Sequence, residues 1–256
     1  MILLLSPAKS LDFDSTWKVA ATTEPVFTDQ AKTLAGQLRT FRPAELQQLM
    51  DISEKLAELN VQRFQDWEPA SAANGGKPAA LAFTGDVYQG LEAGRWTEKQ
   101  WAFAQDHLRI LSGLYGILRP ADLILPYRLE MGTALQTSEG KNLVEFWGQQ
   151  LTDCVNESIA QTNARFVLNL ASNEYFRSVD PKRLATPVVS PVFQDFSGGR
   201  YKTISFYAKK ARGRMASWVI RTRAKTLKKL RQFDADGYVY DAGAGSEHAP
   251  VFRRRQ

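Results

Sequence analysis

The sequence predicts a mixed α/β protein that folds as a single domain over residues 1–256. Short apolar or β-branched segments recur along the whole chain, and each has the composition of a strand. Amphipathic helical segments lie between them, so strands and helices are interleaved. The chain has 256 residues, 44% of them hydrophobic, which suffices for one large core, and no long linker divides it.

Six segments are predicted to form strands. Each is short, apolar or β-branched, and bounded by turn residues. In chain order they are residues 2–5, 79–83, 166–170, 188–193, 203–207 and 238–240.

Helices are predicted between these strands. In residues 53–67, Ser53 occupies an N-cap position and apolar side chains repeat at three-and-four spacing, which indicates one buried face. Thr97 and Gln100 form a capping box that begins another helix. The remaining helices are expected at residues 29–39, 43–50 and 143–160.

Charge is distributed unevenly along the chain. The sequence contains 33 Lys and Arg against 27 Asp and Glu, a net charge of +6. Residues 196–233 contain 12 basic residues and no acidic one, and residues 253–255 form a short basic tail. A segment of this composition is either a solvated helix face or a binding surface for a polyanion such as nucleic acid.

The basic segment has the pattern of an anchored helix. From residue 208 onward, Ala211, Met215 and Val219 fall on one face, so this face is expected to pack on the core. Cations flank the apolar face on both sides. They are Lys209, Lys210, Arg212, Arg214, Arg221 and Arg223.

The composition excludes several classes of protein. Two His and one Cys, Cys154, supply too few ligands for zinc or an iron–sulfur cluster, so neither a metal nor a cofactor is predicted. A single Cys forms no internal disulfide, and no apolar run is long enough to cross a bilayer or to act as a signal peptide. We therefore expect a cytoplasmic protein without a membrane partner.

Three polar residues are candidates for binding or catalysis because they follow predicted strands. Lys9 follows the first, Asp86 lies between Gly85 and Gly90, and Glu174 begins a predicted helix after residue 170. The ends of strands in α/β sheets are where ligands usually bind. Each residue has a structural alternative, as a surface lysine, a turn-forming aspartate or part of a helix N-terminus.

The segment 107–132 embeds charges among apolar residues. Its three arginines stay charged, so any that is buried needs a carboxylate such as Asp122 or Glu130, or a bound anion. The segment is therefore predicted to form either a structural ion-pair network or a phosphate-binding pocket. The arginines are Arg109, Arg119 and Arg128.

The same segment contains a glycine turn. Gly113 and Gly116 are similar to the hairpin glycines of helix-hairpin-helix modules, whose backbone amides contact a DNA phosphate, although two residues separate them instead of one. His107 has no nucleophile motif nearby and is interpreted as structural. Cys154 is interpreted as a buried small residue of a helix and not as a redox sensor, because the nearby Asp153 and Glu157 disfavour a thiolate.

Six segments together resemble the bacterial YaaA family, the peroxide stress proteins. The resemblance spans essentially the whole chain, with the segments in the expected order. They are SPAKSLD at 6–12, SEKLAELNVQRFQDW at 53–67, FTGDVYQGL at 83–91, HLRILSGLYGILRPADLILPYRLEMG at 107–132, NLASNEYFRSV at 169–179 and ISFYAKKARGRMASWVI at 204–220.

The resemblance implies a cytoplasmic protein that helps cells survive hydrogen peroxide by limiting free intracellular iron and the resulting damage to DNA and protein. It also implies a mixed α/β fold with a positively charged cleft, a helix-hairpin-helix element and DNA binding. It carries over no catalytic residue. Ferritin-like iron storage uses Glu-x-x-His motifs, and this sequence has none, so an indirect effect on iron is favoured.

Two hypotheses follow. In the first, the protein binds DNA: the helix cations and the Gly113–Gly116 turn contact phosphates, with Lys9, Arg119 and Arg128 as further phosphate-binding candidates. In the second, it is an enzyme acting on a nucleotide or another phosphorylated small molecule. Lys9, Arg128 and Lys209 then hold phosphate, and Asp86, Glu130 or Glu174 serves as acid or base.

Overall fold

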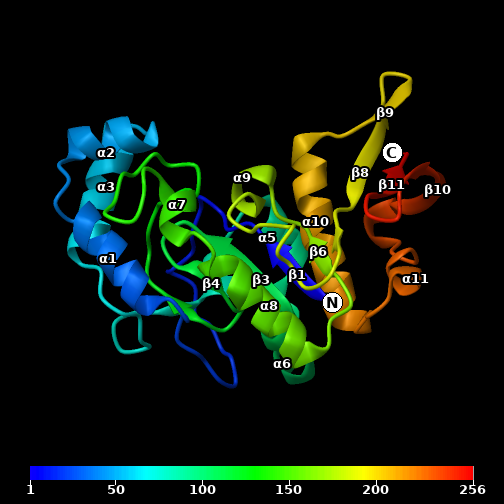
Figure 1. Ribbon diagram of the computed structural model, residues 1–256, viewed down its shortest axis with the longest axis horizontal. Coiled ribbons are helices and arrows are strands. Elements are labelled where there is room, and N and C mark those ends of the chain that lie inside the picture. The colour runs from blue at the N-terminus through cyan, green and yellow to red at the C-terminus, as the bar shows by residue number, and fades with distance from the viewer. Residues whose placement is uncertain (256) are drawn as a thin grey trace.

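The chain folds around three β-sheets with helices packed on and between them (Figure 1). The structure is a computed structural model and describes residues 1–255. Helices of the first 70 residues form one end of the molecule, and the second sheet with the C-terminal strands forms the other. The predicted α/β class is confirmed.

The central sheet places the first strand between two parallel neighbours. β1 pairs in parallel with β3 and β6, β7 continues the parallel part, and β4 lies antiparallel on β3. All four side chains of β1 are aliphatic and buried, as in parallel sheets covered on both faces. In sheet order the strands are β4 (Gly116–Leu118), β3 (Leu108–Ser112), β1 (Ile2–Leu5), β6 (Val167–Asn169) and β7 (Val188–Val189).

Helices cover both faces of this sheet and form the N-terminal end of the molecule (Figure 1). Both predicted caps are confirmed: Ser53 Oγ accepts from the backbone N–H of Leu56, and Thr97 and Gln100 form a capping box. The helices are α1 (Thr28–Leu38), α2 (Pro43–Met50), α3 (Glu54–Gln65), α4 (Ala79–Ala82), α5 (Asp86–Leu91), α6 (Glu98–His107), α7 (Leu143–Trp147), α8 (Gln150–Thr162), α9 (Asn173–Phe176), α10 (Ser205–Thr222) and α11 (Leu227–Leu230).

The second sheet gathers the C-terminal strands. Its order is β10-β11-β8-β9, and Arg253 and Arg254 of the predicted basic tail lie within β11. Arg254 pairs with buried Asp195 at 2.6 Å, and Arg253 pairs with Asp241, so these two charges are neutralised. The strands are β8 (Val192–Ser197), β9 (Arg200–Lys202), β10 (Val239–Gly245) and β11 (Pro250–Arg254), while β2 (Lys77–Pro78) and β5 (Leu123–Ile124) form a third, two-stranded sheet.

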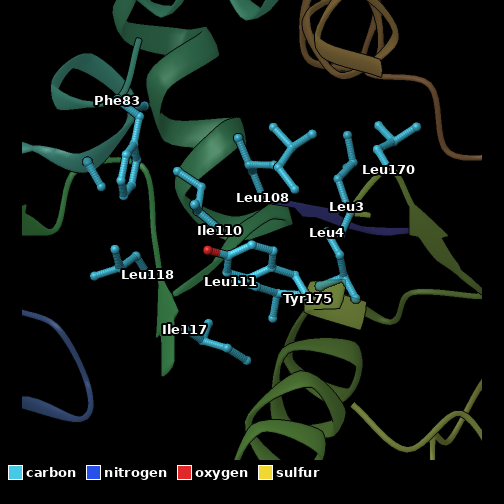
Figure 2. Close-up of a cluster of buried hydrophobic side chains, with 14 of the residues drawn as sticks. Leu3, Leu4, Phe83, Leu108, Ile110, Leu111, Ile117, Leu118, Leu170 and Tyr175 are labelled. Carbon is cyan, nitrogen blue, oxygen red and sulfur yellow. The ribbon is translucent and has the colours of Figure 1, made fainter. Parts of the chain in front are cut away.

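The main core lies between the central sheet and its covering helices. Figure 2 shows Leu3 and Leu4 of β1, Ile110 and Leu111 of β3, and the ring of Tyr175 in one buried cluster. Loops after β1 and β6 start from this core, so residues that follow these strands are held on a rigid base.

Two predicted strands are helices. Of residues 79–83, the first four form α4, because three of these four are alanine, the strongest helix former, and Phe83 makes an isolated bridge with Leu11. Residues 203–207 lead into the first turn of α10, which begins at Ser205. The aromatic pair Phe206 and Tyr207 has strand propensity, but the apolar face of α10 decides the local structure.

Two predicted elements are divided. Residues 188–193 form β7 and the start of β8, which belong to different sheets, and Pro191 between them has no N–H to donate. Residues 143–160 form α7 and most of α8. Gly148, with φ of +49°, ends α7.

Helices α5 and α10 pack through two glycines. A Cβ added to Gly213 of α10 would lie 2.8 Å from the carbonyl carbon of Val87 and 2.9 Å from the amide nitrogen of Leu91. A Cβ on Gly90 of α5 would lie 2.8 Å from the amide nitrogen of Arg214. The two backbones therefore approach as closely as hydrogen side chains allow, which fixes the distance between α5 and α10.

Candidate functional site

A cleft of about 560 Å³ opens where β1 and β6 end. These strands are parallel neighbours, so their carboxyl ends meet at one edge of the sheet, the usual position of ligand sites in α/β folds. The two ends are linked: Ser172 N–H donates to Ser6 Oγ at 2.8 Å, and the two Oγ atoms are 3.2 Å apart. We call this space the strand-end cleft.

The strand-end cleft collects side chains from segments far apart in sequence. All six residues that the enzyme hypothesis assigned to a phosphorylated ligand line it, and Arg212 joins them from α10. Four basic and three acidic side chains therefore share its walls. They are Lys9, Arg128, Lys209 and Arg212 with Asp86, Glu130 and Glu174.

Glu130 is held by two cations at the cleft wall. Its Oε2 lies 2.7 Å from Lys9 Nζ and its Oε1 lies 2.9 Å from Arg128 Nη2. Glu174 Oε1 accepts the backbone N–H of Gly132 at 3.0 Å. Two of the three candidate carboxylates thus already have protein partners, which leaves them less free to act on a ligand.

The part of the cleft lining that α5 and α10 contribute carries groups with no protein partner. Within residues 1–255, Arg212, Lys209 and Asp86 take part in no ion pair and no side-chain hydrogen bond. Burial lowers the pKa of Arg212, a sign that its guanidinium is partly removed from water without a compensating carboxylate. An anion bound here would supply the missing partner.

Two buried tyrosines contribute to the cleft lining. Tyr127 and Tyr175 line it, and the hydroxyl of Tyr127 lies 2.6 Å from Ser112 Oγ. Burial raises the pKa of both phenols, so they stay neutral. Sequence reasoning gave these tyrosines no role, although each stands beside a candidate, Arg128 and Glu174 respectively.

The assignment of Gly113 and Gly116 to a helix-hairpin-helix turn is wrong. Gly113 and Gly116 lie in a turn between strands β3 and β4, and both are buried. A Cβ on Gly113 would meet the backbone of Leu129 at 2.9 Å, and one on Gly116 would meet the Trp147 ring at 2.8 Å. These glycines permit close packing, and their burial separates their amides from a DNA phosphate.

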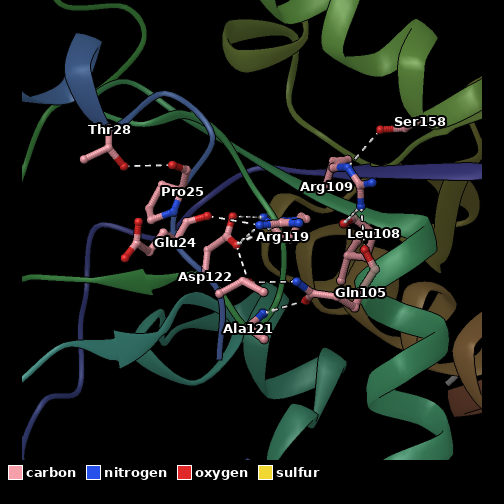
Figure 3. Close-up of polar contacts among 11 residues, drawn as sticks. Glu24, Pro25, Thr28, Gln105, Leu108, Arg109, Arg119, Ala121, Asp122 and Ser158 are labelled. Atoms are coloured by element: carbon pink, nitrogen blue, oxygen red, sulfur yellow. Dashed lines mark hydrogen bonds and ion pairs between the residues drawn. The ribbon is translucent and has the colours of Figure 1, made fainter. Parts of the chain in front are cut away.

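The other two embedded arginines serve the structure (Figure 3). Arg109 is buried and donates to Ser158 Oγ at 3.1 Å and to backbone carbonyls. Arg119 Nε donates to Asp122 Oδ1 at 3.1 Å, and Arg119 Nη2 donates to the carbonyl of Glu24. Arg119 is absent from the cleft lining, so only Arg128 of the three faces this site.

The cations of α10 separate into different environments. Lys209 and Arg212 face the cleft, Lys210 lines a smaller hollow beside Tyr207 and Arg254, and Arg214 pairs with Glu92 and Asp236. Arg221 and Arg223 are exposed at the end of the helix.

Exposed cations continue beyond α10 into α11. Six of them lie within residues 221–231, here called the cationic segment. Among residues 1–255, none of the six pairs with a carboxylate. They are Arg221, Arg223, Lys225, Lys228, Lys229 and Arg231.

His107 and Cys154 have structural environments. His107 is buried, and its Nδ1 lies 3.0 Å from the carbonyl of Met1. Burial raises the pKa of the Cys154 thiol. Within the described chain, no three His, Cys, Asp or Glu side chains are grouped as metal ligands. None of the helices in residues 1–255 has the length and apolar composition needed to span a membrane.

Comparison with known proteins assigns the family. The sequence profile described as peroxide stress protein YaaA matches residues 1–244. The chain belongs to the YaaA family of peroxide stress proteins. Curated relatives, named UPF0246 proteins, include one from Burkholderia vietnamiensis that is 49% identical over 257 residues, covering 100% of this chain and 99% of the relative. One from Paraburkholderia phytofirmans is 48% identical with the same coverage. Membership of the YaaA family supports a role in peroxide stress.

Proposed function

We propose that this peroxide stress protein binds the phosphate backbone of DNA through the cationic segment, residues 221–231. The observation that carries the proposal is that its six cations are exposed and unpaired, while Arg214, Arg253 and Arg254 nearby are each neutralised by a carboxylate. Unpaired cations on one surface release counterions from DNA when they contact phosphates, and this release drives binding without base recognition.

The cationic segment is held in place by the core. Leu230 and Phe233 are each 1% exposed, so the chain is anchored in the core on both sides of Arg231. Lys229 Nζ lies 5.7 Å from the centre of the Trp218 ring, and Arg231 stacks on Tyr240 at 5.3 Å. Ordered cations lose less conformational entropy on binding than cations on a flexible tail.

DNA binding provides a route by which the protein limits iron-dependent damage. Ferrous iron is a cation that condenses on DNA, where its reaction with peroxide forms radicals beside the backbone. A protein that neutralises phosphates displaces condensed cations from the same stretch of DNA. The cationic segment therefore protects DNA by competition for phosphates, without a protein site for iron.

Fluorescence anisotropy with a labelled mixed-sequence duplex tests DNA binding. The triple variant Arg221→Gln/Arg223→Gln/Lys228→Gln removes three charges from the cationic segment and should weaken binding strongly at low salt. Lys18→Gln/Lys32→Gln/Lys55→Gln removes three exposed charges from the N-terminal part of the chain and should bind like wild type. Equal loss in both variants would show a nonspecific charge effect and exclude the cationic segment as the DNA site.

Plasmid nicking tests the protection. Supercoiled plasmid is treated with ferrous iron and hydrogen peroxide in the presence of each variant. Wild type and the control triple variant should slow nicking, and the cationic-segment variant should not. Protection by all three proteins at concentrations where only two bind DNA would refute the proposed competition.

A further inference from the structure

A phosphorylated small molecule is the ligand that best fits the strand-end cleft. The volume of about 560 Å³ lies within the range of small-molecule sites, and the position at the ends of β1 and β6 is the usual one. We propose that the cleft binds a phosphomonoester carrying sugar hydroxyls, such as a nucleotide or a sugar phosphate. This proposal does not depend on DNA binding by the cationic segment.

The phosphate is placed by two unsatisfied guanidinium groups. Arg212 has no partner among residues 1–255, and Arg128 Nε is buried with no hydrogen-bond partner although Nη2 of the same group pairs with Glu130. A buried donor without an acceptor destabilises the protein, and a bound anion removes this cost. Guanidinium groups favour phosphate because two N–H donors match two oxygens, and exposed Lys209 adds charge at the rim.

The acidic groups of the cleft indicate which chemical groups the ligand carries besides its phosphate. A site for inorganic phosphate alone would not place three carboxylates in its lining, since carboxylates repel an anion. Asp86 is free of protein partners and accepts hydrogen bonds only, so it suits the hydroxyl groups of a sugar. Tyr127, Tyr175, Leu129 and Leu170 add apolar surface against which a sugar ring or base packs.

The cleft is also stiff enough to select a ligand. Asp86 begins α5, Arg212 belongs to α10, and the close glycine contact fixes the distance between these helices. Asp86, assigned to the sugar hydroxyls, and Arg212, assigned to the phosphate, are therefore held at a fixed separation by α5 and α10. Preorganised binding sites use this arrangement.

Isothermal titration calorimetry on the full chain tests the proposal with AMP, ribose 5-phosphate, inorganic phosphate and adenosine. AMP and ribose 5-phosphate should bind wild type, and adenosine, which lacks the phosphate, should bind at least about tenfold more weakly. Arg212→Gln should weaken AMP by roughly tenfold or more, because a charged hydrogen bond is lost. Lys55→Gln, which removes an exposed charge from α3, should leave AMP binding unchanged.

Two further variants keep the test decisive. If Arg212→Gln does not fold, as judged by circular dichroism, Lys209→Gln at the exposed rim replaces it and should still weaken AMP. Asp86→Ala should weaken ribose 5-phosphate more than inorganic phosphate, which has no sugar hydroxyl. Absence of binding by AMP and ribose 5-phosphate at millimolar concentration would overturn the proposal.

A phosphate in this cleft has two sources, a free small molecule or a DNA backbone. The duplex anisotropy assay with Arg212→Gln distinguishes them. Unchanged duplex affinity together with weaker AMP binding supports the small-molecule site. Weaker duplex affinity in a protein that binds no AMP would show that the cleft holds a DNA phosphate, and it would refute the small-molecule assignment.

Discussion

Replacing Gly213 with alanine should both destabilise the protein and weaken ligand binding in the strand-end cleft. The added methyl group would overlap the carbonyl oxygen of Val87 and would lie 2.8 Å and 2.9 Å from two further backbone atoms of α5, where ordinary contacts begin near 3.4 Å. These backbone atoms cannot rotate away as a side chain does, so α5 and α10 must move apart by about an ångström or more. Overpacking of this kind costs roughly 1–3 kcal/mol.

The intrinsic preference of alanine for helices acts in the opposite direction. Glycine inside a helix is less favourable than alanine by about 1 kcal/mol, so the net destabilisation by Gly213→Ala is about 0–2 kcal/mol, and more if α5 cannot move. Gly36→Ala in α1 is the matched control, because nothing lies within 4 Å of its added Cβ. That substitution should stabilise the protein by about 0.5–1 kcal/mol.

Urea denaturation followed by circular dichroism compares the two variants, and calorimetry with AMP measures the cleft. We expect a lower urea midpoint and weaker AMP binding for Gly213→Ala, and a higher midpoint with unchanged AMP binding for Gly36→Ala. A Gly213→Ala protein as stable as Gly36→Ala would refute the conclusion that the glycine contact sets the distance between α5 and α10.

Three other substitutions test the folded structure. Hydrogen bonds from Ser15 and the ion pair with buried Lys77 hold the pKa of Asp12 well below its usual range, so Asp12→Asn should lower the urea midpoint at pH 7, with a difference that shrinks below about pH 4. Burial lowers the pKa of His107, so below about pH 6.5 the unfolded state takes up a proton more readily than the folded state, and wild-type stability falls. His107→Gln should reduce this fall, which is measured as the difference between the urea midpoints at pH 7 and pH 5. Tyr115→Phe leaves a buried indole N–H and a backbone N–H without their acceptor and should cost about 1–3 kcal/mol per donor in urea denaturation; a variant as stable as wild type would contradict that estimate.

Local signals in the sequence predicted the elements that local chemistry controls. The apolar run at residues 2–5 and the caps at Ser53 and Thr97 correspond to β1, α3 and α6. Residues 79–83 and 203–207 were assigned to strands because short apolar runs do not show their period, and packing made them helical.

Part of the cleft lining could likewise be predicted from local sequence signals, and the contacts that depend on packing could not. The polar residues that follow predicted strands line one cleft, because the ends of parallel strands converge whatever the detailed topology. The pairing of Arg214 with Glu92 depends on the α5–α10 contact between residues 122 positions apart, and no local pattern reveals it. The Gly113–Gly116 spacing was compatible with a helical hairpin, and only the pairing of β3 with β4 showed otherwise.

The salt dependence of duplex binding tests the central claim most directly. In anisotropy titrations over a series of salt concentrations, the logarithm of the binding constant should fall linearly with the logarithm of salt concentration, by about 0.9 for each phosphate neutralised. The Arg221→Gln/Arg223→Gln/Lys228→Gln variant should reduce the magnitude of this slope by up to about 2.7, while the Lys18→Gln/Lys32→Gln/Lys55→Gln variant should keep the wild-type slope. Identical slopes for all three proteins would contradict the assignment of the cationic segment as the DNA-binding surface.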